Sequence, residues 1–293
     1  MSIKAIVVDM DGTLLTDDHR IGQLTKETLI QAQKKGIKLI LASGRNYRTL
    51  TTYGLQLLMD EYEGYFVGAN GAAVTSVKTK VTEKLQELDQ DELNELYTFA
   101  LNQDVEFLAV QDDTIYSYIP NSMLAIKDKY RKENNIPEDV PNTAGTFQIV
   151  TDQRKGYPYI YNIDSNHEFN INVNKVCIAQ LEDKVTKFEK IFCETYGNQF
   201  DYAKTSPQWF EIMPKGINKG TTIKKLLEYL NISPEETMIF GDGENDIAML
   251  SITSNSIAMA NAMENVKKHA NHVTEFSNNE DGISKYLLKH KIV

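Results

Sequence analysis

The length, composition and charge of the chain narrow the classes of protein to which it can belong. At 293 residues it exceeds the usual size of one domain, and 41% apolar with 25% charged residues is typical of an ordinary globular protein. A formal net charge of -10 argues against a nucleic-acid backbone or an anionic membrane as the main partner. Cys177 and Cys193 lack metal-type spacing, and Lys4 and Asp9 interrupt any apolar leader. We therefore expect a cytoplasmic protein with reduced thiols.

The chain opens with alternating strands and helices. Residues 3–8 form an apolar, β-branched run, which is typical of a parallel strand buried on both faces. A helix over 23–35, ended by Gly36, and an apolar strand over 37–42 complete the strand, helix and strand unit of a parallel sheet. The next expected elements are a helix over 46–59, a strand over 65–69 and a hairpin over 72–82.

A second type of sequence begins at about residue 83. The segment 83–104 is acidic, and its apolar residues recur at helical spacing, which predicts one packed face. Residues 136–174 are rich in Asn, Asp, Pro, Gly and Tyr and are expected to be loops with short strands. Mixed helices and neighbouring strands predict an α+β insert with its own sheet. Its other expected elements are strands over 105–110, 114–119, 175–181, 200–204 and 208–213 and helices over 122–134 and 182–196.

The alternation of the first segment then returns. A helix over 219–230 precedes an apolar strand over 237–240, and shorter elements follow over 245–251, 256–259, 264–269 and 281–289. We therefore expect one doubly wound, Rossmann-like α/β core that the chain both begins and ends. The predicted core comprises residues 1–82 and 207–293, and the predicted α+β domain is inserted over 83–206.

Polar residues follow the predicted strands at positions that the topology brings to one edge of the sheet. The carboxyl ends of parallel strands form this edge, and ligands bind outside it. Asp9 and Asp11 point to the same side of an extended chain, so they repel unless a divalent cation or a proton compensates. The residues expected at this edge are Asp9, Asp11, Ser43, Lys219, Asp242 and Asp246.

This set of side chains has the chemistry of a metal and phosphate site. Three or four carboxylates form the hard-oxygen environment that Mg²⁺ prefers, with water and substrate phosphate as further ligands. Lys219 and Ser43 add a cation and a hydroxyl for phosphate oxygens, and the turn amides after Asp11, at Gly12, can form an anion nest. A carboxylate nucleophile is one route to a phosphoenzyme.

Each residue taken alone also has a simpler explanation. An Asp-x-Asp pair before a glycine can be a polar loop, and an isolated lysine such as Lys219 is usually a solvent-exposed charge. Ser43 can cap a helix, and Asp246 can be a first-turn acid favoured by the helix dipole. The combination at one edge, rather than any single member, favours the phosphate site.

The motifs together resemble those of the haloacid dehalogenase-like hydrolase superfamily, and specifically its Cof-type subfamily IIB. The resemblance covers nearly the whole chain and is weakest across residues 136–174. It implies a Rossmann-like core with a large inserted cap of the C2 type. The matching motifs are at residues 9–14, 41–45, 219–220 and 241–246. Further segments that resemble the subfamily are at 69–72, 258–262 and 279–282.

The resemblance also implies a role for each acidic residue. Asp9 would be the nucleophile that forms an aspartyl-phosphate, and Asp11 would be the general acid for the leaving oxygen and then the base for water. Mg²⁺ would be held by the Asp9 carboxylate, the Asp11 backbone carbonyl and Asp242, with Asp246 in direct or indirect contact.

The remaining matched residues would bind the substrate. Ser43 and Lys219 would hold the transferring phosphoryl group, with Gly12 and Asn245 as further phosphate contacts. Arg45 and Asn70 are additional candidates for contact with the substrate.

The activity implied is that of a Mg²⁺-dependent phosphatase of small phosphorylated metabolites, such as sugar phosphates or phosphorylated cofactors. A phosphomutase or phosphotransferase on the same scaffold would use the same nucleophile. A non-catalytic ligand-binding regulator is the third alternative, and it predicts loss of a carboxylate or lysine that is present here.

Substrate choice and assembly are left open by the sequence. We expect the insert to decide which ester is accepted, and the Tyr-rich segment 155–162 is our hypothesis for a specificity loop, with a plain surface loop as the alternative. The physiological substrate and the choice between monomer and homodimer stay open.

Overall fold

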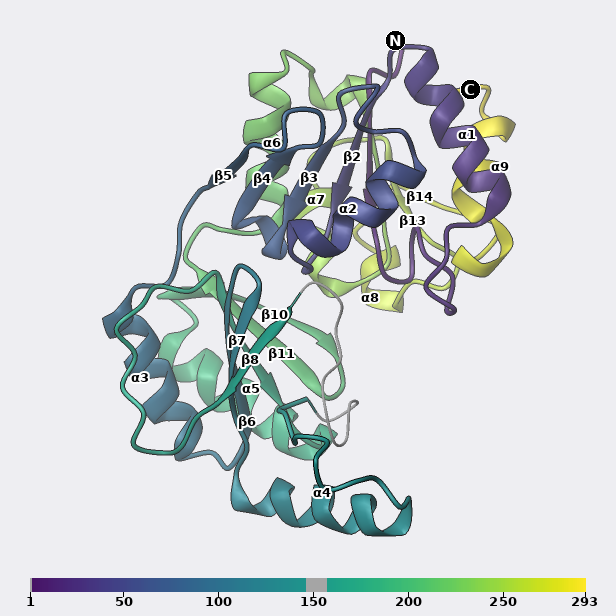
Figure 1. Cartoon of the computed structure of the whole chain (residues 1–293). Coiled ribbons are helices and arrows are strands. Elements are labelled where there is room, and N and C mark those ends of the chain that lie inside the picture. Colours follow the sequence, from purple (N-terminus) through teal and green to yellow (C-terminus); the bar gives the residue numbers. More distant parts are fainter. Residues whose placement is uncertain (1, 146–156) are drawn as a thin grey trace. The chain divides into compact units, whose positions relative to one another are not determined.

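The computed structural model describes residues 2–145 and 157–293, which divide into two compact units (Figure 1). The core unit comprises Met1–Leu85 and Ile217–Val293, and the inserted unit comprises Gln86–Gly216. The first division lies close to the predicted boundary at residue 82. The second lies later than the predicted boundary at residue 206.

The core unit is built on an eight-stranded sheet in the order β14-β13-β12-β1-β2-β3-β4-β5. β1 lies at its centre and pairs in parallel with both β2 and β12, whereas β4 and β5 pair antiparallel at one edge. This arrangement confirms the predicted doubly wound core. The strands are β1 (Ala5–Asp9), β2 (Lys38–Ala42), β3 (Tyr65–Gly68), β4 (Ala73–Ser76), β5 (Thr82–Lys84), β12 (Thr237–Gly241), β13 (Ser256–Ala258) and β14 (His272–Val273).

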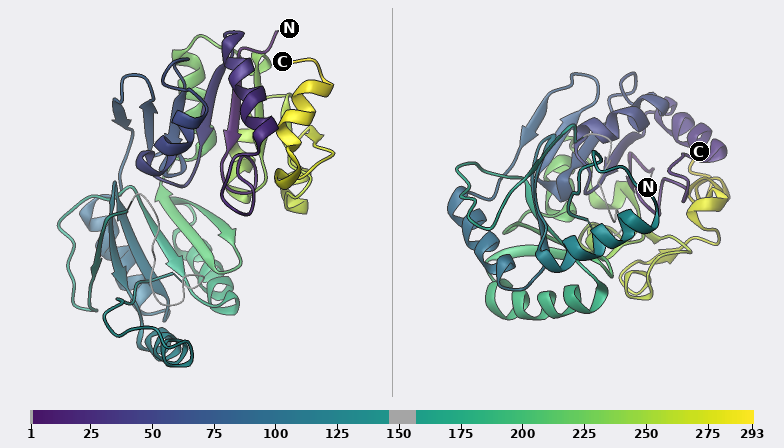
Figure 2. Two further views of the ribbon diagram at one scale, coloured as in Figure 1. Left: turned by 45° about the vertical axis from the view of Figure 1, so that its right-hand side comes forward. Right: turned by 60° about the horizontal axis from the view of Figure 1, so that its bottom comes forward.

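Helices cover this sheet and join the two ends of the chain. α1 and α9 lie side by side (Figure 2), and Thr25 of α1 donates from both its backbone nitrogen (2.9 Å) and its hydroxyl (2.7 Å) to Asp281, the residue before α9. α6 packs beside α7 in the same way. The helices are α1 (Gln23–Lys34), α2 (Tyr47–Gln56), α6 (Lys219–Tyr229), α7 (Ile247–Leu250), α8 (Glu264–Lys267) and α9 (Gly282–Lys289).

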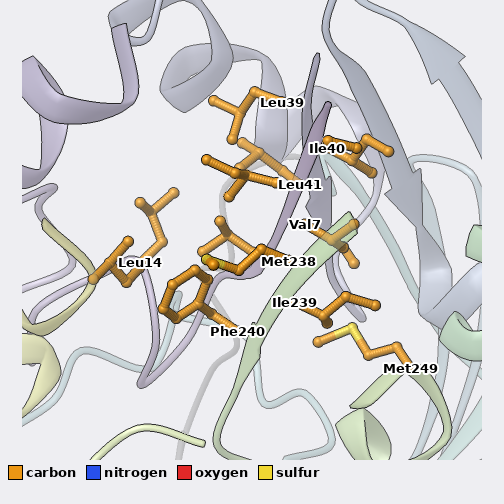
Figure 3. Close-up of a cluster of buried hydrophobic side chains, with 14 of the residues drawn as sticks. Val7, Leu14, Leu39, Ile40, Leu41, Met238, Ile239, Phe240 and Met249 are labelled. Carbon is orange, nitrogen blue, oxygen red and sulfur yellow. The ribbon is translucent and has the colours of Figure 1, made fainter. Parts of the chain in front are cut away.

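The central strands of the core unit are buried along their whole length. All five residues of β1 and all five of β12 are buried, which explains why these segments read as continuous apolar runs rather than alternating ones. Figure 3 shows Val7 of β1, Leu41 of β2 and Phe240 of β12 among the side chains that fill this core. Residues at the carboxyl ends of these strands are therefore anchored to a packed core.

The inserted unit has a six-stranded sheet in the order β10-β11-β9-β6-β7-β8. One face carries aromatic and aliphatic side chains that pack with those of α3 and α5, as in the cluster of Phe107, Phe188 and Phe210. The predicted α+β insert is thus confirmed. Its elements are α3 (Gln90–Leu101), β6 (Glu106–Gln111), β7 (Thr114–Tyr118), α4 (Asn121–Glu133), β8 (Tyr159–Asn162), β9 (Lys175–Ala179), α5 (Glu182–Tyr196), β10 (Phe200–Ser206) and β11 (Trp209–Pro214).

Three sequence-based expectations need correction here. β11 pairs with β9 and β10, so residues 207–216 belong to the inserted unit and not to the core. The expected helix over 83–104 begins only at Gln90, where Asp89 caps α3. Residues 159–162 of the expected specificity loop form the edge strand β8, and residues 155 and 156 lie outside the described part of the chain. In that described part, no helix combines the length and apolarity needed to cross a bilayer.

Candidate active site

Three carboxylates meet at the carboxyl ends of β1 and β12. Asp9 is the last residue of β1, Asp242 follows β12 directly, and Asp246 lies in the next short turn, η3 (Glu244–Asp246). Carboxylate oxygens of the three residues lie within 4.8 Å of one another. This cluster is called the acidic triad below. Its position is the one that the topology of a parallel sheet predicts for a ligand.

Lys219 neutralises part of the charge of the acidic triad. The Asn218 side chain caps α6 and accepts a hydrogen bond from the backbone of Thr221 (2.9 Å), so Lys219 occupies the first position of the helix. Its Nζ donates to Asp9 Oδ1 (2.5 Å) and Asp246 Oδ1 (2.7 Å), and its side chain is only 1% exposed. A surface charge, the simpler explanation, is therefore wrong for Lys219.

Asp246 holds the turn that carries Asp242. Its Oδ2 accepts hydrogen bonds from the backbone nitrogens of Asp242 and Gly243, both at 3.0 Å, while its Oδ1 accepts from Lys219. Both oxygens of this carboxylate therefore already have donors. Asp246 orients Lys219 and the Asp242 turn, and Asp9 and Asp242 are the better placed carboxylates for a cation.

Burial and mutual repulsion make the acidic triad costly to ionise. Burial, followed by the negative charges of Asp246 and Asp242, raises the pKa of Asp9 well above its usual range, although Lys219 opposes this. Burial and the charge of Asp246 raise the pKa of Asp242 to about 7. Burial alone would lower the pKa of Lys219, but Asp246 and Asp9 raise it above its ordinary value. A bound divalent cation would relieve this repulsion.

Gly12 and Thr13 shape the loop that faces Asp242. Gly12 has a φ of +82°, and a Cβ at this position would overlap the Asp242 carboxylate, so only glycine fits without strain. The Thr13 hydroxyl donates to Asp242 Oδ1 (2.5 Å). Thr13 was not predicted as a site residue, although its place directly after Gly12 in the matched motif was a usable signal.

Asp11 lies outside the acidic triad and pairs instead with Arg45. Arg45 Nε donates to Asp11 Oδ2 (2.8 Å), and a terminal guanidinium nitrogen donates to Asp11 Oδ1. The Asp11 side chain is 49% exposed, and His19 Nδ1 lies 3.9 Å from its Oδ1. The structure thus pairs Arg45, a predicted substrate contact, with Asp11, the predicted general acid and base.

Ser43, Asn70 and Asn245 occupy the same edge of the core sheet. The Ser43 side chain is buried and accepts from the Arg45 backbone nitrogen (3.2 Å), and Asn46 rather than Ser43 caps α2. Asn245 donates to Asn70 Oδ1 (3.2 Å). Asn70 is 1% exposed, has a φ of 54° and supports Asn245, and its contact with the substrate stays a prediction.

Comparison with known proteins identifies the family of this site. The sequence profile of the haloacid dehalogenase-like hydrolases matches residues 6–287. The chain belongs to this family. It is 28% identical to the 5-amino-6-(5-phospho-D-ribitylamino)uracil phosphatase YitU of Bacillus subtilis, over 97% of this chain and 96% of that one. It is also 28% identical to the HMP-PP phosphatase of Yersinia pestis, over 89% and 85% of the two chains.

A solved structure gives the same family assignment. The HAD subclass IIB sugar phosphatase BT4131 superimposes with a TM-score of 0.76 at 26% identity, covering 99% of this chain and 100% of that one. Together these matches confirm the predicted resemblance to the Cof-type, subclass IIB members of the family. They support a phosphatase enzyme.

Proposed function

We propose that this protein is a Mg²⁺-dependent phosphatase that hydrolyses phosphate monoesters of small metabolites through an aspartyl-phosphate on Asp9. The observation that carries the proposal is the Asp9 carboxylate, buried at the end of β1, held by Lys219 and set within the acidic triad. The relatives named above act, by their names, on phosphorylated small molecules and on sugar phosphates, which supports this substrate class.

Hydrolysis would take place in two displacement steps, with Asp9 as nucleophile and Asp11 as acid and base. In the first, an Asp9 oxygen bonds to phosphorus, the ester P–O bond breaks, and the leaving oxygen takes a proton from Asp11. In the second, water attacks the phosphorus of the aspartyl-phosphate, Asp11 takes its proton, and phosphate and the Asp9 carboxylate are released. Lys219 fixes the Asp9 carboxylate in orientation throughout, and with Ser43 it would bind phosphoryl oxygens.

The donor set fits a magnesium ion. Asp9 and Asp242 offer hard carboxylate oxygens at the carboxyl ends of neighbouring strands, and burial together with the charge of Asp246 raises the pKa of both in spite of Lys219, which supports a further cation at this site. We assign the ion to these two carboxylates and the Asp11 backbone carbonyl. When bound, it would neutralise charge so that an anionic carboxylate and an anionic phosphate can approach each other.

The inserted unit is proposed to select the substrate. Tyr159 and Tyr161 of β8 are each 53% exposed, so their rings are open to a ligand. The substitution of both by alanine is expected to change the ranking of substrates more than the rate with the best one. An unchanged ranking would remove β8 from the specificity site.

The test of the activity is phosphate release from a panel of phosphorylated sugars and cofactor precursors, with and without Mg²⁺. We expect Mg²⁺-dependent release by the wild type and only background release by Asp9→Asn, with ³²P from labelled substrate trapped on the wild-type protein alone. Phosphorylated products with little free phosphate would indicate a phosphomutase. Binding of an ester without any turnover would indicate a regulator.

A further inference from the structure

The pair formed by Arg45 and Asp11 has the geometry of a fixed fork. Two guanidinium nitrogens, one of them Nε at 2.8 Å, donate to the two oxygens of one carboxylate. A bidentate pair restrains the rotation of a carboxylate as well as its position, which a lysine cannot do. At 49% exposure, Asp11 has little packing of its own to hold its rotamer.

Hydrogen bonds fix the backbone of Arg45 on both sides of the residue. Its nitrogen donates to the Ser43 hydroxyl (3.2 Å), and its carbonyl accepts from Ala69 after β3 (2.9 Å). The Tyr53 hydroxyl, which donates to the His19 carbonyl (3.2 Å), stands beside the same guanidinium. The arginine side chain is 26% exposed, so it is more buried than the carboxylate to which it donates.

We propose that Arg45 is a positioning residue for Asp11, and that it sets the orientation from which Asp11 exchanges protons rather than binding the substrate itself. This inference rests on the proposed function, because it gives Arg45 a role only if Asp11 is the acid and base. Its consequence is that loss of Arg45 slows turnover through Asp11 and leaves substrate affinity nearly unchanged.

The test compares steady-state constants for an alkyl phosphate substrate among Arg45→Ala, Asp11→Asn and the double variant. We expect Arg45→Ala to lower kcat by about 10- to 100-fold with KM changed by less than about threefold, because misorientation of an acid and base acts on the reaction step. The double variant should be no slower than Asp11→Asn alone, since Arg45 has nothing left to position. Arg45→Lys should recover only part of the loss.

A leaving-group comparison separates positioning from general structural damage. A nitrophenolate departs without a proton, whereas an alkoxide needs the proton of Asp11. The first-turnover burst of nitrophenol should therefore be nearly unchanged in Arg45→Ala, while the alkyl ester is slowed. Arg48 is an exposed arginine three residues further along the chain, in α2. Arg48→Ala is therefore the matched control and should have the rates of the wild type on both substrates.

Several outcomes would overturn the inference. An additive double variant, a tenfold rise in KM, or equal losses on both substrates would make Arg45 a substrate-binding or structural residue. A higher kcat of Arg45→Ala would mean that the pair of Arg45 and Asp11 inhibits the enzyme. Full activity of Asp11→Asn would remove the basis for any role through Asp11. Failure of the proposed function is recognised separately, by the absence of Mg²⁺-dependent release from the wild type or by its persistence in Asp9→Asn.

Discussion

Asp242→Asn is expected to stabilise the core unit when no metal is bound and the pH is neutral or higher. Asp242 shares the acidic triad with Asp9 and Asp246, and only one ammonium, that of Lys219, pairs with this cluster in the described residues. Asparagine removes one negative charge but retains an oxygen that can accept the Thr13 hydroxyl, which now donates to Asp242 Oδ1. The change therefore isolates the electrostatic effect of the carboxylate.

The size of this effect follows from the pKa of Asp242. Burial and the charge of Asp246 raise it from the ordinary 3.8 to about 7. Below pH 3.8 the carboxyl is protonated in the folded and the unfolded chain alike, so it leaves the free energy of unfolding unchanged. As the pH rises from there, the unfolded chain releases its proton first, and a penalty on the folded state grows. At about 1.4 kcal/mol per pKa unit the penalty reaches about 4 kcal/mol, of which about 3 kcal/mol accumulates between pH 5 and pH 8.

Hydrogen exchange measured separately in the two units is the suitable assay. The only tryptophan, Trp209, lies in β11 of the inserted unit, so its fluorescence does not report on the core. Amides of β12 report on the core unit and those of β9 serve as the internal reference. In EDTA at pH 8 we expect slower exchange in β12 of Asp242→Asn than of the wild type, with a smaller difference at pH 5 and none in β9.

Addition of Mg²⁺ narrows the difference in stability between the two proteins. Saturation at about 100 times the dissociation constant should stabilise the wild-type core by about 3 kcal/mol, because only the folded chain assembles the site. Asp242→Asn should gain much less. The reasoning is refuted if Asp242→Asn is no more stable than the wild type at pH 8 in EDTA, or if Mg²⁺ stabilises both proteins equally.

Three further substitutions test neighbouring parts of the structure, each against a matched control. Lys219→Met should abolish phosphatase activity and destabilise the core by about 3 to 5 kcal/mol, since it removes the partner of two buried carboxylates; exposed Lys224→Met on the same helix should do neither. Gly12→Ala should lower the free energy of unfolding by about 1 to 3 kcal/mol and lower Mg²⁺ affinity. Gly36→Ala has a similar φ of +87° but open space around it, so it should show only the destabilisation that comes from backbone strain. Lys127→Met should destabilise the inserted unit by about 3 to 5 kcal/mol, as read from Trp209 fluorescence, because Glu106 is 0% exposed and loses its ammonium at 3.0 Å. Lys129→Met, at an exposed position on the same helix, is the control. For each of the three substitutions, an equal loss of stability in its control would contradict the role given to the substituted residue.

The central fold could be predicted because its strands are buried on both faces. A strand such as β1 must then be apolar throughout, and the polar residue that ends it, Asp9, necessarily lies at the carboxyl edge of the sheet. The same logic placed Asp242 after β12. Connectivity alone brought these residues together, so no knowledge of side-chain packing was needed.

The parts that could not be predicted depend on long-range pairing. β11 reads as a strand, but whether it joins the core or the insert is decided by its register with β9 and β10. The partner of Arg45 lies 34 residues away in Asp11 and depends on side-chain rotamers. Asparagine tolerates the left-handed backbone of Asn70 better than most residues, but its contacts with the Ser43 carbonyl and the Asn245 side chain join distant parts of the chain, which no local pattern encodes.

The charges of the acidic triad support the proposal that a divalent cation binds beside the buried Lys219. Three ionised carboxylates and the ammonium of Lys219 leave two negative charges uncompensated in a largely buried cluster. Without a cation the cluster retains protons instead, which is what the raised pKa values of Asp9 and Asp242 express. A second lysine would still leave one negative charge and would occupy the carboxylate that is proposed to attack phosphorus. A divalent cation would compensate both negative charges and would still accept a phosphate oxygen as a ligand. Under the proposed function, the lysine therefore orients Asp9, and the remaining negative charge is what a magnesium ion would compensate.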